Sequence, residues 1–150
     1  MLTHSGQRVD LRDPDPACVT LDDIARALAV CRRFAGAGIS VAEHSVIVTR
    51  RLREQGHPPD VQLAGLLHDA AEAYTGDVIA PFKALIRGHR TLEARIDEAI
   101  LHALGHAGLD LHNPTVKQAD RWAIPQEAGM VGLGAKGARR AFLREYERLI

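Results

Sequence analysis

The chain has 150 residues, a length that suits one domain with a single hydrophobic core and is too short for two of ordinary size. Nineteen Lys and Arg residues balance nineteen Asp and Glu residues, so no excess positive charge is present to follow a phosphate backbone, and duplex nucleic acid is not expected as a partner. The two cysteines, Cys18 and Cys31, match no metal-knuckle or redox spacing, and no segment resembles a signal peptide or a membrane-spanning run. These features predict a cytoplasmic protein with no membrane partner.

The first 19 residues differ from the rest of the chain. They mix Gly, Asp and Pro and show no helical period, so they are predicted to form an arm of loops with one short strand at 8–11 ("RVDL"). This arm must pack against the remaining domain, residues 20–150, whose apolar residues repeat at three and four positions. The absence of alternating strands and helices predicts an all-α domain of about six or seven helices.

Two helices have clear start signals. Thr20 followed by Asp23, and Ser40 followed by Glu43, are typical of capping boxes. A third helix is expected to start at Asp60 and to continue without interruption to Gly76, a residue type that commonly follows a helix end. Because this third helix is apolar on most faces, it is predicted to lie at the centre of the domain.

The second half of the chain predicts three longer helical segments and one short one. A short helix or turn is expected at 80–86 ("APFKALI"), and a long amphipathic helix at 91–105, closed by Gly105. Asn113 and Pro114 fit the cap and first position of the next helix. A Gly-rich loop at 129–137 ("GMVGLGAKG") is then expected to separate it from a final helix that contains Phe142 and Tyr146.

Polar residues interrupt the apolar third helix. His68 and Asp69 are adjacent in "LLHDAAEAYTGD" (66–77), and on a helix both can converge on a point between them. Glu72 projects from the same side one turn later, and Asp77 follows the expected helix end. A buried carboxylate without a partner is costly, so the cluster indicates either a metal site or an ion pair with an arginine.

A divalent ion needs more ligands than one helix offers, so other helices must contribute. His44 and Asp120 occupy places in helical segments where apolar residues would be expected, which makes them the remaining candidate ligands. Each is individually ambiguous, because a lone His is more often a hydrogen-bonded core residue and a lone Asp is more often solvated.

Four ordered segments, "AEHS", "LLHDAAEAYTGD", "PFK" and "KQAD", resemble the HD-domain metal-dependent phosphohydrolases. The similarity is greatest to the small branch that includes the bacterial 5′-deoxyribonucleotidases. The opening of the chain, residues 5–34, is also similar to that of phage dATP triphosphohydrolases. The resemblance covers about residues 5–124 and the last helix. The stretch between "RF" and "SVAEHS" is shorter than in these relatives, and the segment after Asp120 is short and Gly-rich.

The resemblance implies a role for each matching residue. It implies that one divalent ion, of a type the sequence does not specify, is bound by His44, His68, Asp69 and Asp120. It further implies that Glu72 and Asp77 are the acid/base and water-orienting carboxylates. Arg33 and Lys83 would contact the substrate phosphate, although Arg32 beside Arg33 leaves the choice of arginine open.

Three functions follow as expectations. The first is a 5′-deoxyribonucleotidase that releases phosphate from deoxynucleoside monophosphates, which suits a metal site with charged phosphate contacts. The second is a dNTP triphosphohydrolase that releases triphosphate. The third, of another class, is a catalytically idle nucleotide-binding module. A homo-oligomer, a dimer by analogy, is expected in each case.

Overall fold

The computed structural model describes residues 1–150 and consists of helices and connecting loops without any strand, which confirms the predicted all-α class. Six helices have nine or more residues and two have four. Their bounds, in chain order, are α1 (Leu21–Val30), α2 (Val41–Glu54), α3 (Pro59–Leu67), α4 (Glu72–Thr75), α5 (Ala80–Lys83), α6 (His89–Ala103), α7 (Pro114–Glu127) and α8 (Gly134–Leu149). Single 3₁₀ turns lie at Pro16–Cys18 (η1) and Phe34–Gly36 (η2). No helix combines the length and the apolar character needed to cross a membrane.

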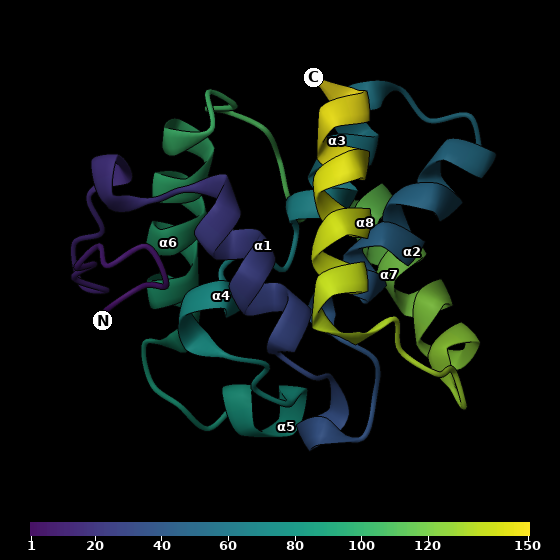
Figure 1. Cartoon of the computed structure of the whole chain (residues 1–150), viewed down its shortest axis with the longest axis horizontal. Coiled ribbons are helices and arrows are strands. Elements are labelled where there is room, and N and C mark those ends of the chain that lie inside the picture. The colour runs from purple at the N-terminus through teal and green to yellow at the C-terminus, as the bar shows by residue number, and fades with distance from the viewer.

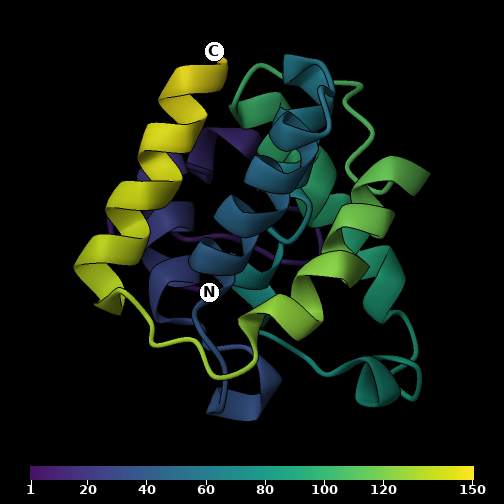
Figure 2. The same cartoon turned by 90° about the vertical axis from the view of Figure 1, so that its right-hand side faces the viewer.

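Helix α2 is the centre of the bundle, and it packs against α1, α3, α7 and α8 (Figures 1 and 2). Its start is the predicted capping box: the Ser40 side chain accepts from the Glu43 N–H, and the Glu43 carboxylate accepts from the Ser40 N–H at 3.0 Å. Val41, Val48 and Leu52 are fully buried in the hydrophobic core. The sequence predicted the third helix, α3, to be the central one. In the structure the central helix is instead α2, which precedes α3 in the chain.

The helix predicted at 60–76 is interrupted, so the prediction of one continuous helix is wrong. Helix α3 ends at Leu67, a turn covers 68–71, and α4 begins at Glu72 and ends where Gly76 adopts a φ of 76°. The reason lies in a side chain: His68 Nδ1 bonds to the carbonyl oxygen of Gly65 at 2.8 Å, and the N–H of Asp69 would need that same carbonyl in an α-helix. The interruption therefore sits at the polar residues of the candidate site.

Two predicted helix starts and one predicted strand also differ from the structure. Helix α3 begins at Pro59, with Pro58 at the cap, so Asp60 lies in the first turn instead of capping the helix. Helix α8 begins at Gly134, inside the segment predicted as a Gly-rich loop. The strand predicted at 8–11 is absent, and only an isolated bridge joins Leu2 to Arg8. Each case involves short local signals that tertiary packing overrides.

The N-terminal arm is attached to the bundle by buried contacts. Val9 is part of the hydrophobic core, and the N–H and Oγ of Ser5 donate to the Asp23 carboxylate of α1 at 2.8 and 2.6 Å. The arm runs beside α6 and α1 in Figure 1. The aspartate that the sequence placed in a capping box at the start of α1 thus holds the arm instead, while Thr20 alone caps the helix.

Helices α2 and α3 pack closely against each other at Gly65. A Cβ built there would lie 2.4 Å from Leu52 Cδ1 and 3.4 Å from Val48 Cγ1, and because Leu52 is fully buried, any shift of its side chain must be accommodated by the densely packed core. We predict that Gly65→Ala lowers the free energy of unfolding by about 1–3 kcal/mol through overpacking. Urea denaturation monitored by circular dichroism measures this, with Glu98→Ala at an exposed helical position as the control. Equal stability of the two variants would contradict the close approach.

A carboxylate on α8 joins three helices. Glu145 accepts hydrogen bonds from Arg53 of α2 at 3.1 Å and from Arg148 at 2.9 Å, and Arg148 also donates to Gln62 of α3 at 3.0 Å. Burial raises the pKa of Glu145, but the hydrogen bonds from Arg148 and Arg53 outweigh burial and hold the pKa below its usual value. A depressed folded-state pKa stabilises the fold above the unfolded value, and this stabilisation is lost as pH falls through the folded pKa.

We therefore predict that Glu145→Gln lowers the free energy of unfolding by about 1 kcal/mol at pH 7, since the arginines are partly exposed and screened. The deficit should shrink as the pH falls below about 4.3, the ordinary pKa of glutamate, because the unfolded chain is protonated there first and the folded carboxyl follows at lower pH. Urea titrations of both proteins at pH 7 and pH 3.5 measure the two differences. A deficit of the same size at both pH values would show that the charge of Glu145 is not what stabilises the fold.

Candidate metal centre

Three separate elements bring the four candidate ligands together. His44 lies in the first turn of α2, His68 and Asp69 lie in the turn after α3, and Asp120 lies in the middle of α7. His44 Nε2 is 3.3 Å from His68 Nε2, 3.1 Å from Asp120 Oδ1 and 3.6 Å from Asp69 Oδ2. His68 Nε2 is 3.2 Å from Asp69 Oδ2 and 4.0 Å from Asp120 Oδ1. The structure thus brings together residues that are up to 76 positions apart in the sequence.

The outer nitrogen of each imidazole has its own partner. His44 Nδ1 contacts Glu127 Oε1, and His68 Nδ1 lies 2.8 Å from the carbonyl oxygen of Gly65. Since a carboxylate and a carbonyl only accept hydrogen bonds, each Nδ1 is assigned as the protonated nitrogen. In the neutral form of each ring, Nε2 then carries a lone pair directed at the other ring.

In this neutral tautomer two imidazole lone pairs and two carboxylates face one another. The space between them can hold a cation, either a proton on an imidazole or a metal ion. Ligand atoms at about 2.1 Å from one ion lie about 3.0–3.4 Å apart at tetrahedral or octahedral angles. The contacts of 3.1–3.6 Å around His44 fit that spacing closely. His44, His68 and Asp69 form the tightest part of the cluster, and their ligand atoms lie within 4.8 Å of one another.

The pKa of His68 is raised and the pKa of Asp69 is lowered, so both shifts favour the charged form of the residue. Burial lowers the pKa of His68, but Asp69 beside it has the larger effect in total and raises the pKa to about 9. Burial raises the pKa of Asp69, whereas His68, His44 and Arg33 together hold it well below its usual range. A proton on His68 therefore occupies the place of a metal cation, so metal binding must release it.

Arg33 lies beside this cluster. Its Nη1 is 3.4 Å from Asp69 Oδ2 and its Nε is 3.1 Å from Glu127 Oε2, with the side chain 10% exposed. Arg32, in contrast, is exposed, and its Nε donates to the carbonyl oxygen of Gly36 at 3.3 Å. Of the two arginines that the sequence left open, Arg33 is the one directed at the candidate site.

Glu72 and Lys83 form a second group next to the first. Lys83 Nζ donates to Glu72 Oε1 at 3.1 Å and to Glu93 Oε1 at 2.9 Å, while Glu72 Oε2 is buried without a hydrogen-bond partner. Burial is the main cause that raises the pKa of Glu72 to about 8; the charge of Asp69 adds to the rise, and Lys83 opposes it. Glu72 is therefore a carboxyl that exchanges its proton near neutral pH.

Asp77 lies just beyond the end of α4. Its backbone N–H donates to Cys31 Sγ at 3.2 Å, which ties the segment after Gly76 to the end of α1. The charges of Asp77, Glu72 and Asp69 all raise the pKa of the Cys31 thiol, although burial is the largest cause. The carboxylates of Asp69, Glu72 and Asp77 therefore all lie close enough to Cys31 to affect its pKa.

Two residues of the site were missed by the sequence analysis. Glu127 lies seven residues after Asp120, which is two turns along the same face of α7, and this spacing could have identified it. Glu93 lies four residues after His89 on α6, and its Oε2 is 3.1 Å from His89 Nδ1. No local sequence pattern links Glu93 to Lys83, because the two residues lie on different helices, α6 and α5, and come into contact only when the chain folds.

No protein-family model matches the chain, but two curated proteins are similar to it. The chain is 32% identical to the uncharacterized protein YfdR of Escherichia coli (strain K12) over 134 residues, which cover 87% of the chain and 71% of YfdR. It is 41% identical to the uncharacterized protein RCAP_rcc00048 of Rhodobacter capsulatus over 105 residues, which cover 64% of the chain and 53% of that protein. The chain therefore spans about half the length of the Rhodobacter protein.

We predict that Glu127→Ala weakens the binding of Mn²⁺ by about 10–100-fold, because the imidazole of His44 loses the group that orients it and raises its basicity. Isothermal titration calorimetry at pH 7.5 measures the affinity. Glu127→Gln, which keeps an acceptor oxygen without the charge, should fall between the wild type and the alanine variant. Glu54→Ala, at an exposed position on α2, is the control. An affinity equal to that of the control would exclude Glu127 from a supporting role.

Proposed function

The chain belongs to the same family as YfdR of Escherichia coli, and from the geometry of its candidate metal centre we propose that it is a metal-dependent phosphohydrolase that acts on nucleotides. The proposal names one divalent ion as the cofactor, with His44, His68, Asp69 and Asp120 as its ligands. Within this class we propose a 5′-deoxyribonucleotidase, because the four motif segments resemble those of the small HD-domain enzymes most closely.

The observation that carries the proposal is the cluster of facing acceptor groups described above. When both rings are neutral, two imidazole lone pairs and two carboxylates converge on one point, and a cation bound there would contact all four groups. A divalent ion bound there would polarise a phosphoryl oxygen and lower the pKa of a water molecule. The ligand set of imidazole and carboxylate groups suits several first-row metals, and availability decides among them.

Glu72 supplies the proton chemistry in this proposal. Its Oε2 is buried and free of any protein partner, so it can accept a hydrogen bond from a water molecule, and its raised pKa suits proton transfer near neutral pH. Lys83 holds the other carboxylate oxygen, which orients Glu72. Asp77 contributes negative charge nearby and is proposed to orient the same water molecule.

Arg33 is the proposed phosphate contact. A guanidinium matches phosphate oxygens in a bidentate geometry, and Arg33 is buried at the edge of the cluster. Its Nη1 donates to Asp69 Oδ2 at 3.4 Å, which places the guanidinium directly beside a proposed metal ligand. Lys83 is a weaker phosphate candidate than the sequence indicated, because Glu72 and Glu93 already neutralise it. We therefore propose for Lys83 mainly a role in orienting Glu72.

The substrate is tested by incubating the protein with each of Mn²⁺, Co²⁺, Mg²⁺ and Zn²⁺ and with deoxynucleoside mono- and triphosphates. Release of inorganic phosphate from a monophosphate supports the 5′-deoxyribonucleotidase. Release of inorganic triphosphate from a dNTP would instead establish the triphosphohydrolase alternative. Nucleotide binding without turnover under any metal would leave the idle binding module as the function and overturn the proposed activity.

We predict that Glu72→Gln lowers kcat by about 10²–10⁴-fold, since general acid–base catalysis contributes about this much. Mn²⁺ affinity should stay within a few-fold of the wild type, because Glu72 is not a proposed ligand. Steady-state kinetics and calorimetry on the same preparation measure both quantities, and Glu54→Gln serves as the matched control. Loss of metal binding in Glu72→Gln would show that the residue is a ligand instead.

A further inference from the structure

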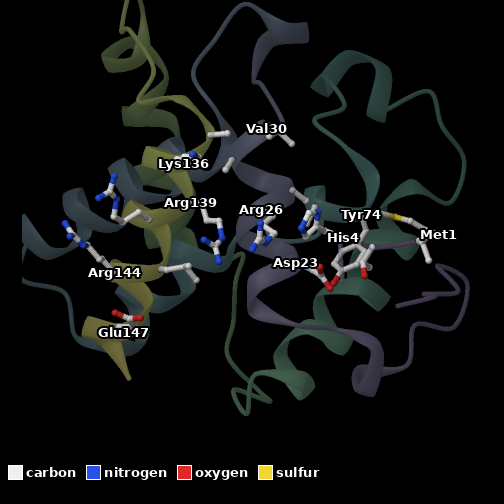
Figure 3. A pocket seen from close by; sticks show the side chains of 18 residues that line it. Met1, His4, Asp23, Arg26, Val30, Tyr74, Lys136, Arg139, Arg144 and Glu147 are labelled. Carbon is white, nitrogen blue, oxygen red and sulfur yellow. The ribbon is translucent and has the colours of Figure 1, made fainter. Parts of the chain in front are cut away.

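A cavity of about 880 Å³ lies between α1, α8 and the N-terminal arm, with Ala73 and Tyr74 of α4 at one side (Figure 3). Its volume falls in the range of small-molecule sites, about 300–1,000 Å³. None of the residues assigned to the candidate metal centre lines it. The cavity is therefore a separate feature of the molecule, and neither the metal centre nor the proposed hydrolysis accounts for it.

One wall of the cavity carries positive charge. Lys136, Arg140 and Arg144 follow one another at four-residue spacing along α8, and no carboxylate lies within ion-pair distance of any of them. Five Lys and Arg residues line the cavity against two carboxylates, Asp23 and Glu147, so the net field favours an anion. The carboxylate oxygens of Asp23 already accept two hydrogen bonds from Ser5, although Asp23 keeps its negative charge.

Two further arginines are held in place at the centre of the cavity. Arg26 of α1 and Arg139 of α8 face each other across the gap between their helices in Figure 3. Both bind the carboxylate of Asp22: Arg26 Nε lies 2.7 Å from Oδ2, and Arg139 Nε lies 3.1 Å from Oδ1. One carboxylate between two guanidinium groups leaves one positive charge in excess and N–H donors available to a ligand.

The remaining surface of the cavity is apolar, with one isolated donor. Ala27, Val30 and Leu143 are among the apolar lining residues, and Val30 is 65% exposed. Tyr74 lines the cavity beside Asp23 in Figure 3; the residue is only 7% exposed, and its hydroxyl is buried without a hydrogen-bond partner in the protein. Burial and the nearby Asp23 raise the pKa of Tyr74 to about 12, so the hydroxyl stays protonated and can donate. A buried donor without a protein partner can bond to water or to a ligand.

We propose that this cavity binds a small amphipathic organic anion. The acidic group, a phosphate, carboxylate or sulfonate, lies among the cationic side chains of Arg26, Arg139 and the α8 row. The apolar part of the ligand covers Ala27 and Val30 of α1. The Tyr74 hydroxyl donates a hydrogen bond to the ligand. This binding does not depend on the proposed hydrolysis, since it uses no residue of the metal centre.

The test uses a matched pair of fluorescent probes. 8-Anilinonaphthalene-1-sulfonate carries an apolar ring system and one negative charge, and N-phenyl-1-naphthylamine has the same rings without the sulfonate. We expect the sulfonate to bind at least about tenfold more tightly than the neutral probe, and its affinity to fall as the salt concentration rises. Fluorescence titration of the wild-type protein at 0.05 and 0.5 M NaCl measures both effects. Equal affinity for the two probes would overturn the proposal.

Variants locate the binding site. The double variant Lys136→Glu/Arg140→Glu should weaken sulfonate binding at least about tenfold, since it reverses two charges of the cationic wall. Lys117→Glu/Arg121→Glu is the matched control, because it places the same change at the same spacing on α7, outside the cavity. Tyr74→Phe, which removes only the donor, should weaken binding about three- to tenfold.

Circular dichroism confirms that each variant is folded before it is titrated. An affinity of the α8 double variant equal to that of the wild type would place the probe elsewhere and overturn the proposal. An equal loss in the α7 control would show attraction by the overall charge only and would also overturn it. Sedimentation velocity supplies one more outcome: a dimer that buries the cavity and excludes the sulfonate would assign this face to a second copy of the chain.

Discussion

The hydrogen bond between His68 Nδ1 and the carbonyl oxygen of Gly65 is the interaction on which the site depends. It occupies the acceptor that would continue α3, so the helix gives way to a turn at His68 and Asp69. The same hydrogen bond fixes the tautomer of His68 with a proton on Nδ1 and directs Nε2 towards His44. Gly65 also lacks the Cβ that would keep α3 away from α2. One residue thus permits the close approach of two helices and orients a ligand at their interface.

Acidic and basic side chains alternate around this point. Glu127 lies between His44 and Arg33, and Arg33 lies between Glu127 and Asp69. On the other side, Lys83 lies between Glu72 and Glu93. Buried charges of this kind cost desolvation energy that pairing offsets only in part, so they are poor stabilisers of a fold. They therefore contribute little to the stability of the fold, and the proposed function assigns them chemical roles.

Helix α4 borders both the candidate metal centre and the cavity. It carries Glu72 on the side of the metal centre, while Ala73 and Tyr74 line the cavity beside α1 and α8. A helix of four residues has little rigidity of its own and takes its position from its neighbours. The cavity and the metal centre therefore share a structural element although they share no functional residue.

The sequence by itself determined the helical class and the capping box at Ser40, because apolar periodicity and capping residues are local signals. It also named His44, His68, Asp69 and Asp120 as candidate ligands, and the structure brings these four side chains together. It could not determine that the predicted helix at 60–76 breaks, since the break depends on which carbonyl the His68 ring selects. Only the tertiary structure decided that Glu127 contacts His44, that Lys83 pairs with Glu93 as well as with Glu72, and that a cationic cavity forms beside α8. These features join segments distant in the chain, and contacts of that kind are created by packing, which no local pattern encodes.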